Sequence, residues 1–425
     1  MHIVYADADG KLYDSERLQA AGRTAGDITE LTGEEWIALP EGATIVSLPG
    51  TRALGVHPVT GKLTALPENY TAVGALLPQG FTRLYLPAYF RPSASEPLPL
   101  FGYSAVGFEN GQFYVAAYQS DDPVPWDPLQ YQNLDVAAKV GDLQQRFPQN
   151  RLYQHLETCA LYYECVTSRN TFFARGEGAI PVSPTCNAGC VGCISEQEAD
   201  SGFPSPQTRL TIRPTVDEMV ELMVEHLASA GPNAIISFGQ GCEGEPSMRG
   251  REIADAIRRT RQIIQVGYIN INTNAGNTRN IKQIVDSGLD LMRISTISAL
   301  ADHYDVYYRP RGYCVSDVEE SARYAAQHEV IVSLNYLVFP GITDTVEEMD
   351  AITQFILRTG VKLIQLRNLN IDPDYYLARV PRRSKPVGML EFMNQIKTRC
   401  PDVRLGSYTH PGTWYGVGRP APTTR

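Results

Sequence analysis

Short runs of apolar and β-branched residues, separated by turn residues, occupy the chain up to about residue 125. An Asn-Gly or Asp-Gly pair between two such runs favours a tight hairpin turn. Asn110-Gly111 stands between residues 104–108 and 113–117, so we expect an antiparallel hairpin there. The pattern predicts a β-rich N-terminal domain over residues 1–130.

The pattern becomes helical after the prolines at 123, 125 and 128, from about residue 134 to residue 166. Residues 131–177 are therefore expected to form a helical linker. Cys159 and Cys165 are six positions apart, which on one continuous helix places them about 120° apart around the axis. His155 and Cys159, four positions apart, share a face. We expect both cysteines to be buried as small apolar groups; an accessory metal site is the alternative.

Short apolar strands alternate with helices from about residue 179 onward. Three of the helices begin at capping-box sequences, running from Thr215, Ser316 and Thr345 to a glutamate three positions later. Such alternation implies βα units with right-handed crossovers and a parallel sheet. The strands are predicted at residues 179–183, 234–238, 268–272, 291–295, 330–335 and 361–366.

The number of these βα units limits which fold the chain can form. Six βα units are too few for a closed eight-fold barrel, so we predict an α/β fold with a partial (βα)6 TIM-like barrel over residues 178–425. Residues 389–405 of its C-terminal extension are expected to add a helix and a strand. Ligands of such folds bind at the carboxyl ends of the strands, and the loop after the first strand lies there.

Composition and charge narrow the function classes. A chain of 425 residues favours two domains over one. A net charge of -10 argues against broad nucleic-acid binding, which needs a basic face. No apolar run approaches the ~18 residues of a membrane span, and the first residues do not resemble a signal peptide. We therefore expect a cytoplasmic protein, without membrane or nucleic-acid partners, whose cysteines stay reduced or bind metal.

Three of the eight cysteines fall within eight positions, as Cys186, Cys190 and Cys193, directly after the first predicted strand. Disulfides pair thiols two at a time, so this odd group in C-x3-C-x2-C spacing indicates another use. Thiolates are soft ligands that select zinc or an iron–sulfur cluster. Three protein ligands leave one coordination position open, which is typical of a reactive centre.

A C-x3-C-x2-C loop after the first strand of a βα repeat resembles the radical S-adenosylmethionine (radical SAM) superfamily. The resemblance covers roughly residues 178 to 380. It implies that the three cysteines hold three irons of a four-iron, four-sulfur (4Fe-4S) cluster, and that S-adenosylmethionine (SAM) chelates the fourth iron. One position departs from the family pattern. The residue before the third cysteine is commonly aromatic, and here it is Gly192, so an adenine contact at this position is made by the backbone.

The resemblance also implies contacts between SAM and residues at the strand ends. After strand two, Gly244-Glu245 resembles the family's Gly-Gly-Glu-like turn, whose polar groups meet the amino group of SAM. An arginine after strand four suits the SAM carboxylate, because a guanidinium donates two parallel hydrogen bonds; Arg309 and Arg311 are alternatives for this role. The further positions implied are Asn274, Arg293, Ser295 and Asn335, with Gln365 or Arg367 at the same end.

The chemistry implied by the resemblance is reductive cleavage of SAM at the cluster to a deoxyadenosyl radical, which abstracts hydrogen from a substrate. This requires a one-electron donor of the flavodoxin or ferredoxin type. The expected substrate is a small molecule, or a short peptide held partly by the N-terminal domain. A peptide maturase with auxiliary clusters would carry a cysteine-rich C-terminal extension, whereas only Cys400 follows Cys314 here.

Two alternatives stay open at this point. Gly244-Glu245-Pro246 also resembles RNA-modifying radical SAM methyltransferases, whose second mechanistic cysteine would be Cys314 or Cys400; the acidic charge argues against them. The other alternative is a non-catalytic zinc or iron–sulfur binding protein. Zinc sites usually present paired ligands at both ends, and the sequence has no second C-x2-C and no close histidine pair. The sequence assigns no role to Cys242.

Overall fold

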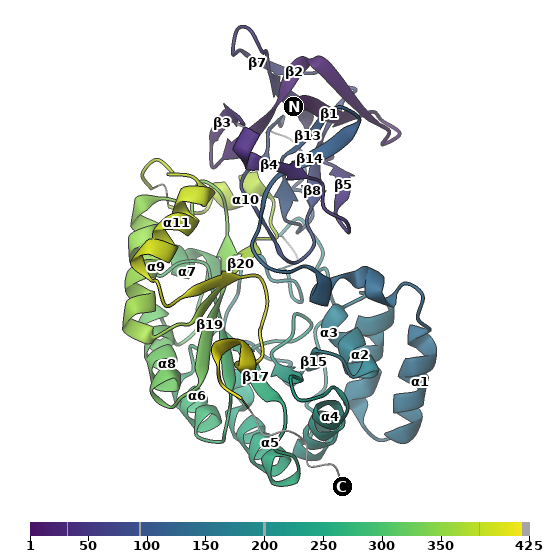
Figure 1. Ribbon diagram of the computed structural model, residues 1–425, viewed down its shortest axis with the longest axis vertical. Helices are drawn as coiled ribbons and strands as arrows, with labels where there is room; N and C mark the ends of the chain where they lie inside the picture. The colour runs from purple at the N-terminus through teal and green to yellow at the C-terminus, as the bar shows by residue number, and fades with distance from the viewer. Residues whose placement is uncertain (32, 93–94, 199–200, 382, 419–425) are drawn as a thin grey trace.

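The computed structural model describes residues 1–31, 33–92, 95–198, 201–381 and 383–418 (Figure 1). Two sheets organise these residues: an antiparallel sheet at the N-terminus and a parallel sheet in the remainder of the chain. Three helices lie between the two sheets along the chain. No helix in this described part of the chain is long and apolar enough to cross a membrane.

The N-terminal region is β-rich and antiparallel, as predicted. Its described strands form one sheet of fourteen, built around the order β11-β6-β2-β1-β13-β14-β4. The predicted hairpin is confirmed, since β13 pairs with β14 from Val106↔Val115 to Glu109↔Gln112. Asn110 and Gly111 both have positive φ, as a two-residue turn of this kind requires. The strands are β1 His2–Ala6, β2 Leu12–Thr24, β3 Asp27–Glu30, β4 Trp36–Ala38, β5 Thr44–Ser47, β6 Arg52–Val56, β7 Leu63–Ala65, β8 Thr71–Leu76, β9 Phe81–Arg83, β10 Leu86–Pro87, β11 Tyr89–Phe90, β12 Tyr103–Ser104, β13 Val106–Glu109 and β14 Gln112–Gln119.

The segment is helical, and it contains three helices rather than one continuous helix. It consists of α1 Val136–Arg146, α2 Arg151–Leu161 and α3 Val166–Phe173. The side chain of Asn150 caps α2 by accepting from the Leu152 N–H. After α2, Glu164 takes a left-handed φ of 50° and reverses the chain. Cys159 therefore lies on α2, and Cys165 lies at the N-cap of α3. The angle expected between them on one helix does not apply.

The parallel sheet runs β15-β16-β17-β18-β19-β20-β21, in the same order as the chain. All six predicted strands are present, and the strand expected near residue 405 is the seventh. The first strand lies earlier than predicted, because it ends at Ile180 rather than Ser183. Strands β16 and β17 are buried along their whole length, as strands covered on both faces must be. The strands are β15 Glu177–Ile180, β16 Ile235–Phe238, β17 Tyr268–Thr273, β18 Leu291–Thr296, β19 Ile331–Val338, β20 Leu363–Asn368 and β21 Arg404–Gly406.

The helices between these strands are those the periodicity predicts, but only one of the three capping boxes is right. The Thr215–Glu218 box is confirmed. Helix α8 begins two residues earlier than predicted, with Cys314 as its N-cap and Asp317 completing the box. Glu348 does not cap α9, because its carboxylate accepts from His303 and Ser298 instead. The helices are α4 Val216–Ser229, α5 Gly250–Ile263, α6 Thr278–Val285, α7 Ala301–Tyr308, α8 Val315–Gln327, α9 Val346–Thr359, α10 Pro373–Leu377 and α11 Met389–Arg399.

The N-terminal region packs against the segment that follows β20 (Figure 1). The Asn368 side chain accepts from the Arg83 N–H at 2.9 Å and donates to the Phe81 carbonyl at 3.0 Å. The buried Arg83 guanidinium donates to the Leu369 carbonyl at 2.9 Å. The buried carboxylate of Asp372 accepts from Arg91 at 2.7 Å and from the Leu98 N–H at 2.6 Å. The antiparallel region is thus fastened at the carboxyl end of the parallel sheet.

We expect Asp372→Ala to lower the free energy of unfolding by about 3 kcal/mol or more, because it leaves buried donors without their acceptor. Those donors are the Leu98 N–H and, in the cap of α10, the Tyr375 N–H. Denaturant unfolding followed by tryptophan fluorescence measures the change. Asp350→Ala, which removes an exposed pair with Arg399, is the matched control and should cost less than about 1 kcal/mol. Equal losses in the two variants would contradict this role for Asp372.

Candidate functional site

The three-cysteine loop leaves the carboxyl end of β15 and is pinned by backbone hydrogen bonds to the end of α7. The Gly189 N–H donates to the Tyr308 carbonyl at 2.9 Å, and the Val191 N–H donates to the Tyr307 carbonyl at 2.9 Å. The Arg311 N–H donates to the Asn187 carbonyl at 2.8 Å. This pairing fixes the path of the loop between its cysteines.

The Gly-rich loop after β16 packs directly on the cysteine loop. The Gly244 N–H donates to the Ser183 carbonyl at 2.7 Å, and the Glu245 N–H donates to the Thr185 carbonyl at 2.9 Å. A Cβ atom on Gly244 would lie 2.2 Å from the Thr185 carbonyl oxygen. Only glycine therefore allows the two loops to approach this closely. The sequence analysis associated this glycine with a ligand, and the atom it approaches is a backbone oxygen of the cysteine loop.

Glu243 joins the ends of β15 and β16 and was missed by the sequence analysis. One carboxylate oxygen accepts from the N–H groups of Val182 and Ser183, each at 2.7 Å. The other accepts from the N–H groups of Gly239 and Gln240, at 2.9 and 2.8 Å. Burial raises the pKa of Glu243 to about 8, and the four N–H donors act in the opposite direction. A glutamate in a Gly-rich loop after a buried strand was the available signal.

Glu245 makes the same kind of connection to the next strand. Its carboxylate accepts from the Ser247 N–H at 2.9 Å, from the Asn274 N–H at 2.8 Å and from the Thr273 hydroxyl. Burial raises the pKa of this carboxyl group as well. The Asn274 amide reaches back and donates to the Asn187 side chain at 2.7 Å. The ends of β15, β16 and β17 are therefore linked by two buried carboxylates and one amide pair.

Burial and neighbouring charges oppose the ionisation of Cys186 and Cys190. Burial raises the pKa of Cys186 to about 11, with Glu245 and Cys193 contributing. Burial is also the main reason that the pKa of Cys190 lies well above its usual range, and the neighbouring thiols of Cys193 and Cys186 raise it further. The Arg209 guanidinium faces the group, since its Nη2 lies 3.4 Å from the Cys193 sulfur. A bound metal centre would lower these thiol pKa values, because its positive charge favours the deprotonated, coordinating thiolates.

The spacing of the sulfurs bears on which metal centre fits. In a tetrahedral zinc site with Zn–S distances near 2.3 Å, the sulfurs lie about 3.8 Å apart. Among the described residues, three ligand atoms come within 4.8 Å of one another only at His155, Cys159 and Cys242. The sulfurs of Cys186, Cys190 and Cys193 are therefore spread more widely than a single zinc ion requires. Such spacing suits a larger, polynuclear centre with three cysteine ligands.

A cavity of about 380 Å³ lies at the carboxyl ends of the parallel strands, with the three cysteines in its wall. Two polar atoms at this cavity are buried without a hydrogen-bond partner: Nε of Arg293 and the hydroxyl of Tyr308. Arg293 is otherwise held by Gln365 at 3.3 Å and Thr409 at 3.2 Å. The lining includes seven of the expected cofactor residues, Gly192, Gly244, Glu245, Asn274, Arg293, Ser295 and Asn335, together with Arg367.

Comparison with known families agrees with this arrangement. Residues 180–356 match the family model of the Radical SAM superfamily. This part of the chain is a radical SAM domain. The match begins at the end of β15 and ends within α9, so it contains the cysteine loop, the Gly-rich loop and the first five strand ends of the parallel sheet. None of the curated proteins searched matches the sequence.

Several solved structures are similar to this chain at low sequence identity. One is methylornithine synthase, at 12% identity over 56% of this chain and 66% of that one, with a TM-score of 0.36. A radical SAM methyltransferase from Sphaerobacter thermophilus has 15% identity over 55% and 66%, with a TM-score of 0.40. SuiB from Streptococcus suis, bound to SAM, has 11% identity over 66% and 62%, with a TM-score of 0.39. The chain spans less than two thirds of each of these proteins, and no reaction is assigned from similarities this distant.

Two of the expected residues lie outside the cavity of the radical SAM domain. Arg309 and Arg311 line a neighbouring space of about 320 Å³, whose lining shares the three cysteines and Arg209 with that cavity. Arg309 ends α7 with a left-handed φ of 45° and pairs with the exposed Glu198 at 3.3 Å. The structure therefore places both arginines near the cysteine loop and apart from the strand-end residues.

The glycine before the third cysteine has a steric explanation. A Cβ atom on Gly192 would lie 2.9 Å from the Tyr307 hydroxyl and 3.4 Å from the Asn370 carbonyl. No aromatic side chain fits there without displacing Tyr307. Tyr307 itself lines the cavity from α7, so an aromatic group is supplied from a different element. Two tyrosines at the end of a helix gave no sequence signal for this.

We expect Gly244→Ala to displace the cysteine loop of the radical SAM domain, because the added methyl group would overlap the Thr185 carbonyl. In the metal-free protein, the thiols of that loop should then react at least about tenfold faster with a thiol reagent, as local opening becomes easier by more than about 1.4 kcal/mol. Gly141→Ala in α1, where nothing lies within 4 Å, is the control and should leave the reaction rate unchanged. Equal rates in both variants would contradict the close approach of the two loops.

Proposed function

We propose that the chain is a radical SAM enzyme. In this proposal, Cys186, Cys190 and Cys193 hold a 4Fe-4S cluster, and SAM occupies the cavity beside them. The observation that carries the proposal is the cavity itself, which has three widely spaced thiols on one wall and unpartnered polar groups of Arg293 and Tyr308 on another. Buried polar groups are expected to find partners, and a polar ligand would supply them.

When bound, the cluster and SAM supply one-electron cleavage of a carbon–sulfur bond and, through it, hydrogen abstraction from a substrate. The residues of the chain bind and orient the ligand. Arg293 offers its free Nε to a carboxylate or a ribose oxygen. Ser295 and Asn335, which lie 3.4 Å apart on neighbouring strands, offer further polar contacts. Glu245 acts mainly through its backbone, since its carboxylate already accepts three hydrogen bonds within the protein.

Arg309 and Arg311 take a different part in the proposal. Because they border the cysteines from the other cavity, they would lower the energy of negative charge on the cluster rather than bind SAM directly. The same face is where we propose that a flavodoxin- or ferredoxin-type donor delivers its electron. Both kinds of donor are acidic proteins as a class, and an arginine pair offers them complementary charge.

The proposal also covers the barrel and the division of the chain into domains. We infer that β15 to β20 form a partial (βα)6 barrel with β21 as an addition, and that residues 1–130, 131–177 and 178–425 act as N-terminal domain, linker and catalytic domain. A reducing compartment such as the cytoplasm suits eight cysteines that are all free of disulfides.

A small molecule or a short peptide is the proposed substrate. The N-terminal region supports the cavity wall, because Gln79 accepts from Arg367 at 2.7 Å and the Phe101 carbonyl accepts from the Ile371 N–H at 3.2 Å. An RNA methyltransferase with a second mechanistic cysteine is disfavoured by where Cys314 and Cys400 lie. Cys314 is exposed at the N-cap of α8, Cys400 is buried after α11, and neither belongs to the residues described as lining the cavity.

The central experiment is SAM cleavage by the anaerobically reconstituted protein. Reduced with dithionite, the wild type should be brown and should release 5′-deoxyadenosine and methionine from SAM. Cys190→Ala removes one of the three ligands and should lose both the broad visible absorption and at least about 99% of the product. Cys314→Ala, an exposed cysteine outside the cavity, should retain both. Equal product from wild type and Cys190→Ala would refute the catalytic proposal, and a colourless, zinc-loaded wild type would favour the non-catalytic alternative.

Binding of SAM tests the role of Arg293 separately. Arg293→Met keeps an apolar stem of similar length and removes the free Nε. We expect the Kd for SAM to rise about 10- to 100-fold, the equivalent of about 1.5–3 kcal/mol for one hydrogen bond from a charged group. Equilibrium dialysis against the reconstituted protein measures it, and the iron content should stay at the wild-type value. An unchanged Kd would remove Arg293 from the proposed site.

A further inference from the structure

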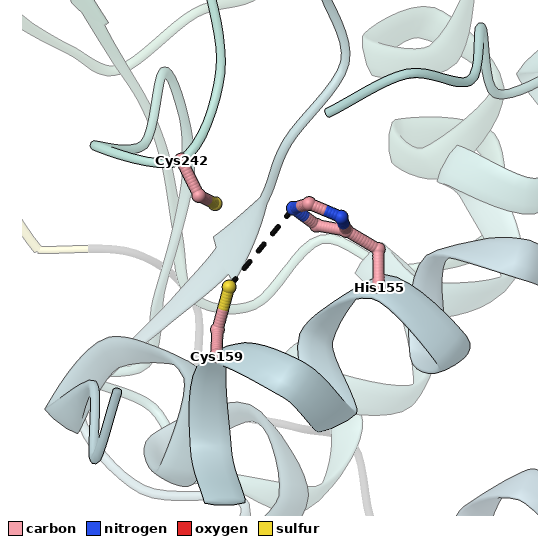
Figure 2. A group of neighbouring side chains, drawn as sticks. All are labelled: His155, Cys159 and Cys242. Atoms are coloured by element: carbon pink, nitrogen blue, oxygen red, sulfur yellow. Dashed lines mark hydrogen bonds between the residues drawn. The ribbon is translucent and has the colours of Figure 1, made fainter. Parts of the chain in front are cut away.

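Three donor side chains from distant parts of the chain converge behind the Gly-rich loop (Figure 2). His155 and Cys159 come from adjacent turns of α2, and Cys242 comes from the loop after β16. Their ligand atoms all lie within 4.8 Å of one another. The two cysteines are only 2% and 5% exposed, while His155 is partly open to solvent. Cys242 is not among the residues that line the cavity of about 380 Å³ beside the cysteine loop. The group is therefore distinct from that cavity.

The separations are close to those of a tetrahedral metal site. With Zn–S distances near 2.3 Å and Zn–N distances near 2.0–2.1 Å, a sulfur and a nitrogen ligand lie about 3.6 Å apart and two sulfurs about 3.8 Å apart. The Cys159 sulfur lies 3.9 Å from Nε2 of His155. Side-chain adjustments of a few tenths of an ångström to one ångström would bring all three atoms onto one ion.

A fourth donor, which is the third sulfur, stands beside this group. Cys165 donates from its backbone N–H to the Cys159 carbonyl at 2.9 Å, because the turn after α2 reverses the chain. Its sulfur lies 3.1 Å from the Thr167 hydroxyl, which in turn donates to the Gln240 side chain at 3.2 Å. Gln240 belongs to the same loop as Cys242. The Cys165 thiol contacts the Thr167 hydroxyl and is not one of the three ligand atoms that lie within 4.8 Å of one another, so it would have to turn away from Thr167 to bind the same ion.

We propose that His155, Cys159, Cys165 and Cys242 bind one zinc ion, or another soft divalent metal, as a structural site. The cysteines coordinate as thiolates and release their protons to solvent on binding, and the histidine coordinates as the neutral ring through Nε2. The site does not depend on the proposed SAM chemistry. It fastens α2 to the loop that carries Glu243 and Gly244, the two residues that hold the cysteine loop in place. The sequence favours buried apolar cysteines here, because Cys159 and Cys165 would lie about 120° apart on one helix and Cys242 is assigned no role.

Cobalt binding tests the proposal on the full-length chain. The background is the Cys186→Ala, Cys190→Ala, Cys193→Ala variant, because it leaves no other cluster of cysteines to bind metal. Titrated anaerobically with Co²⁺ alone, it should bind one equivalent and show the intense visible bands of tetrahedral cobalt with thiolate ligands. One equivalent of Zn²⁺ should then remove these bands. Absence of the bands, or an octahedral cobalt spectrum, would overturn the proposal.

Single substitutions in this background identify the ligands. Cys159→Ser, Cys242→Ser and His155→Ala should each weaken Co²⁺ binding by more than about 100-fold, which exceeds the effect of losing an outer-sphere partner. Cys400→Ser, a buried cysteine elsewhere, should bind as the background does. Unchanged binding in Cys159→Ser and Cys242→Ser would overturn the site. Cys165→Ser should lower the intensity of the thiolate bands, and an unchanged spectrum would remove Cys165 from the ligand set.

A measurement on the otherwise wild-type chain guards against simple misfolding of the variants. The chain purified from cells grown without added metal should contain about one zinc in addition to any cluster iron, by elemental analysis. His155→Ala, the substitution at the most open of the four positions, should lose that zinc while keeping its far-ultraviolet circular dichroism. Retention of the zinc in His155→Ala, or mass spectrometry showing a Cys159–Cys242 disulfide in place of zinc, would refute the proposal.

Discussion

The site depends above all on one buried carboxylate, that of Glu243. Four backbone N–H groups, two from the end of β15 and two from the end of β16, point at its two oxygens. N–H groups at loop starts have no strand partners of their own and would otherwise be buried unsatisfied. A carboxylate with two lone pairs on each oxygen satisfies all four at once, which no neutral side chain can do. The backbone at the start of the cysteine loop is therefore held in one position. This in turn helps to fix the positions of the three cysteine side chains that follow.

The same edge of the sheet is closed by the N-terminal region. Asn368 pairs with the backbone of Phe81 and Arg83 as a strand would, and Arg83 is buried over the carbonyls that follow β19 and β20. A parallel sheet leaves the loops at its carboxyl end exposed, and the antiparallel region covers part of them. Arg367, which lines the cavity, is held from this side by Gln79.

The strands and the cysteine loop could be predicted from the sequence because both are local signals. Apolar runs such as residues 234–238 and the spacing of Cys186, Cys190 and Cys193 need no knowledge of the fold. The convergence of Glu243 on two strand ends was not predictable, because its donors are backbone groups some sixty residues apart in sequence. The failed capping box at Glu348 has the same cause, since a buried histidine and serine compete for its carboxylate. The break after α2 rests on one left-handed residue, Glu164, which has no sequence signature of its own.

Sulfur spacing separates the two cysteine groups that flank the Gly-rich loop. On one side, Cys186, Cys190 and Cys193 lie along a loop whose backbone is held by hydrogen bonds at Gly189 and Val191, and their sulfurs do not form a group within 4.8 Å. On the other side, the helical repeat of α2 places His155 and Cys159 on one face, and their ligand atoms lie within 4.8 Å of each other and of the Cys242 sulfur. Metal choice then follows from geometry rather than from ligand type, because both groups offer thiolates. The loop from Gly239 to Glu245 is the element common to both, so a metal at either group would stiffen the other.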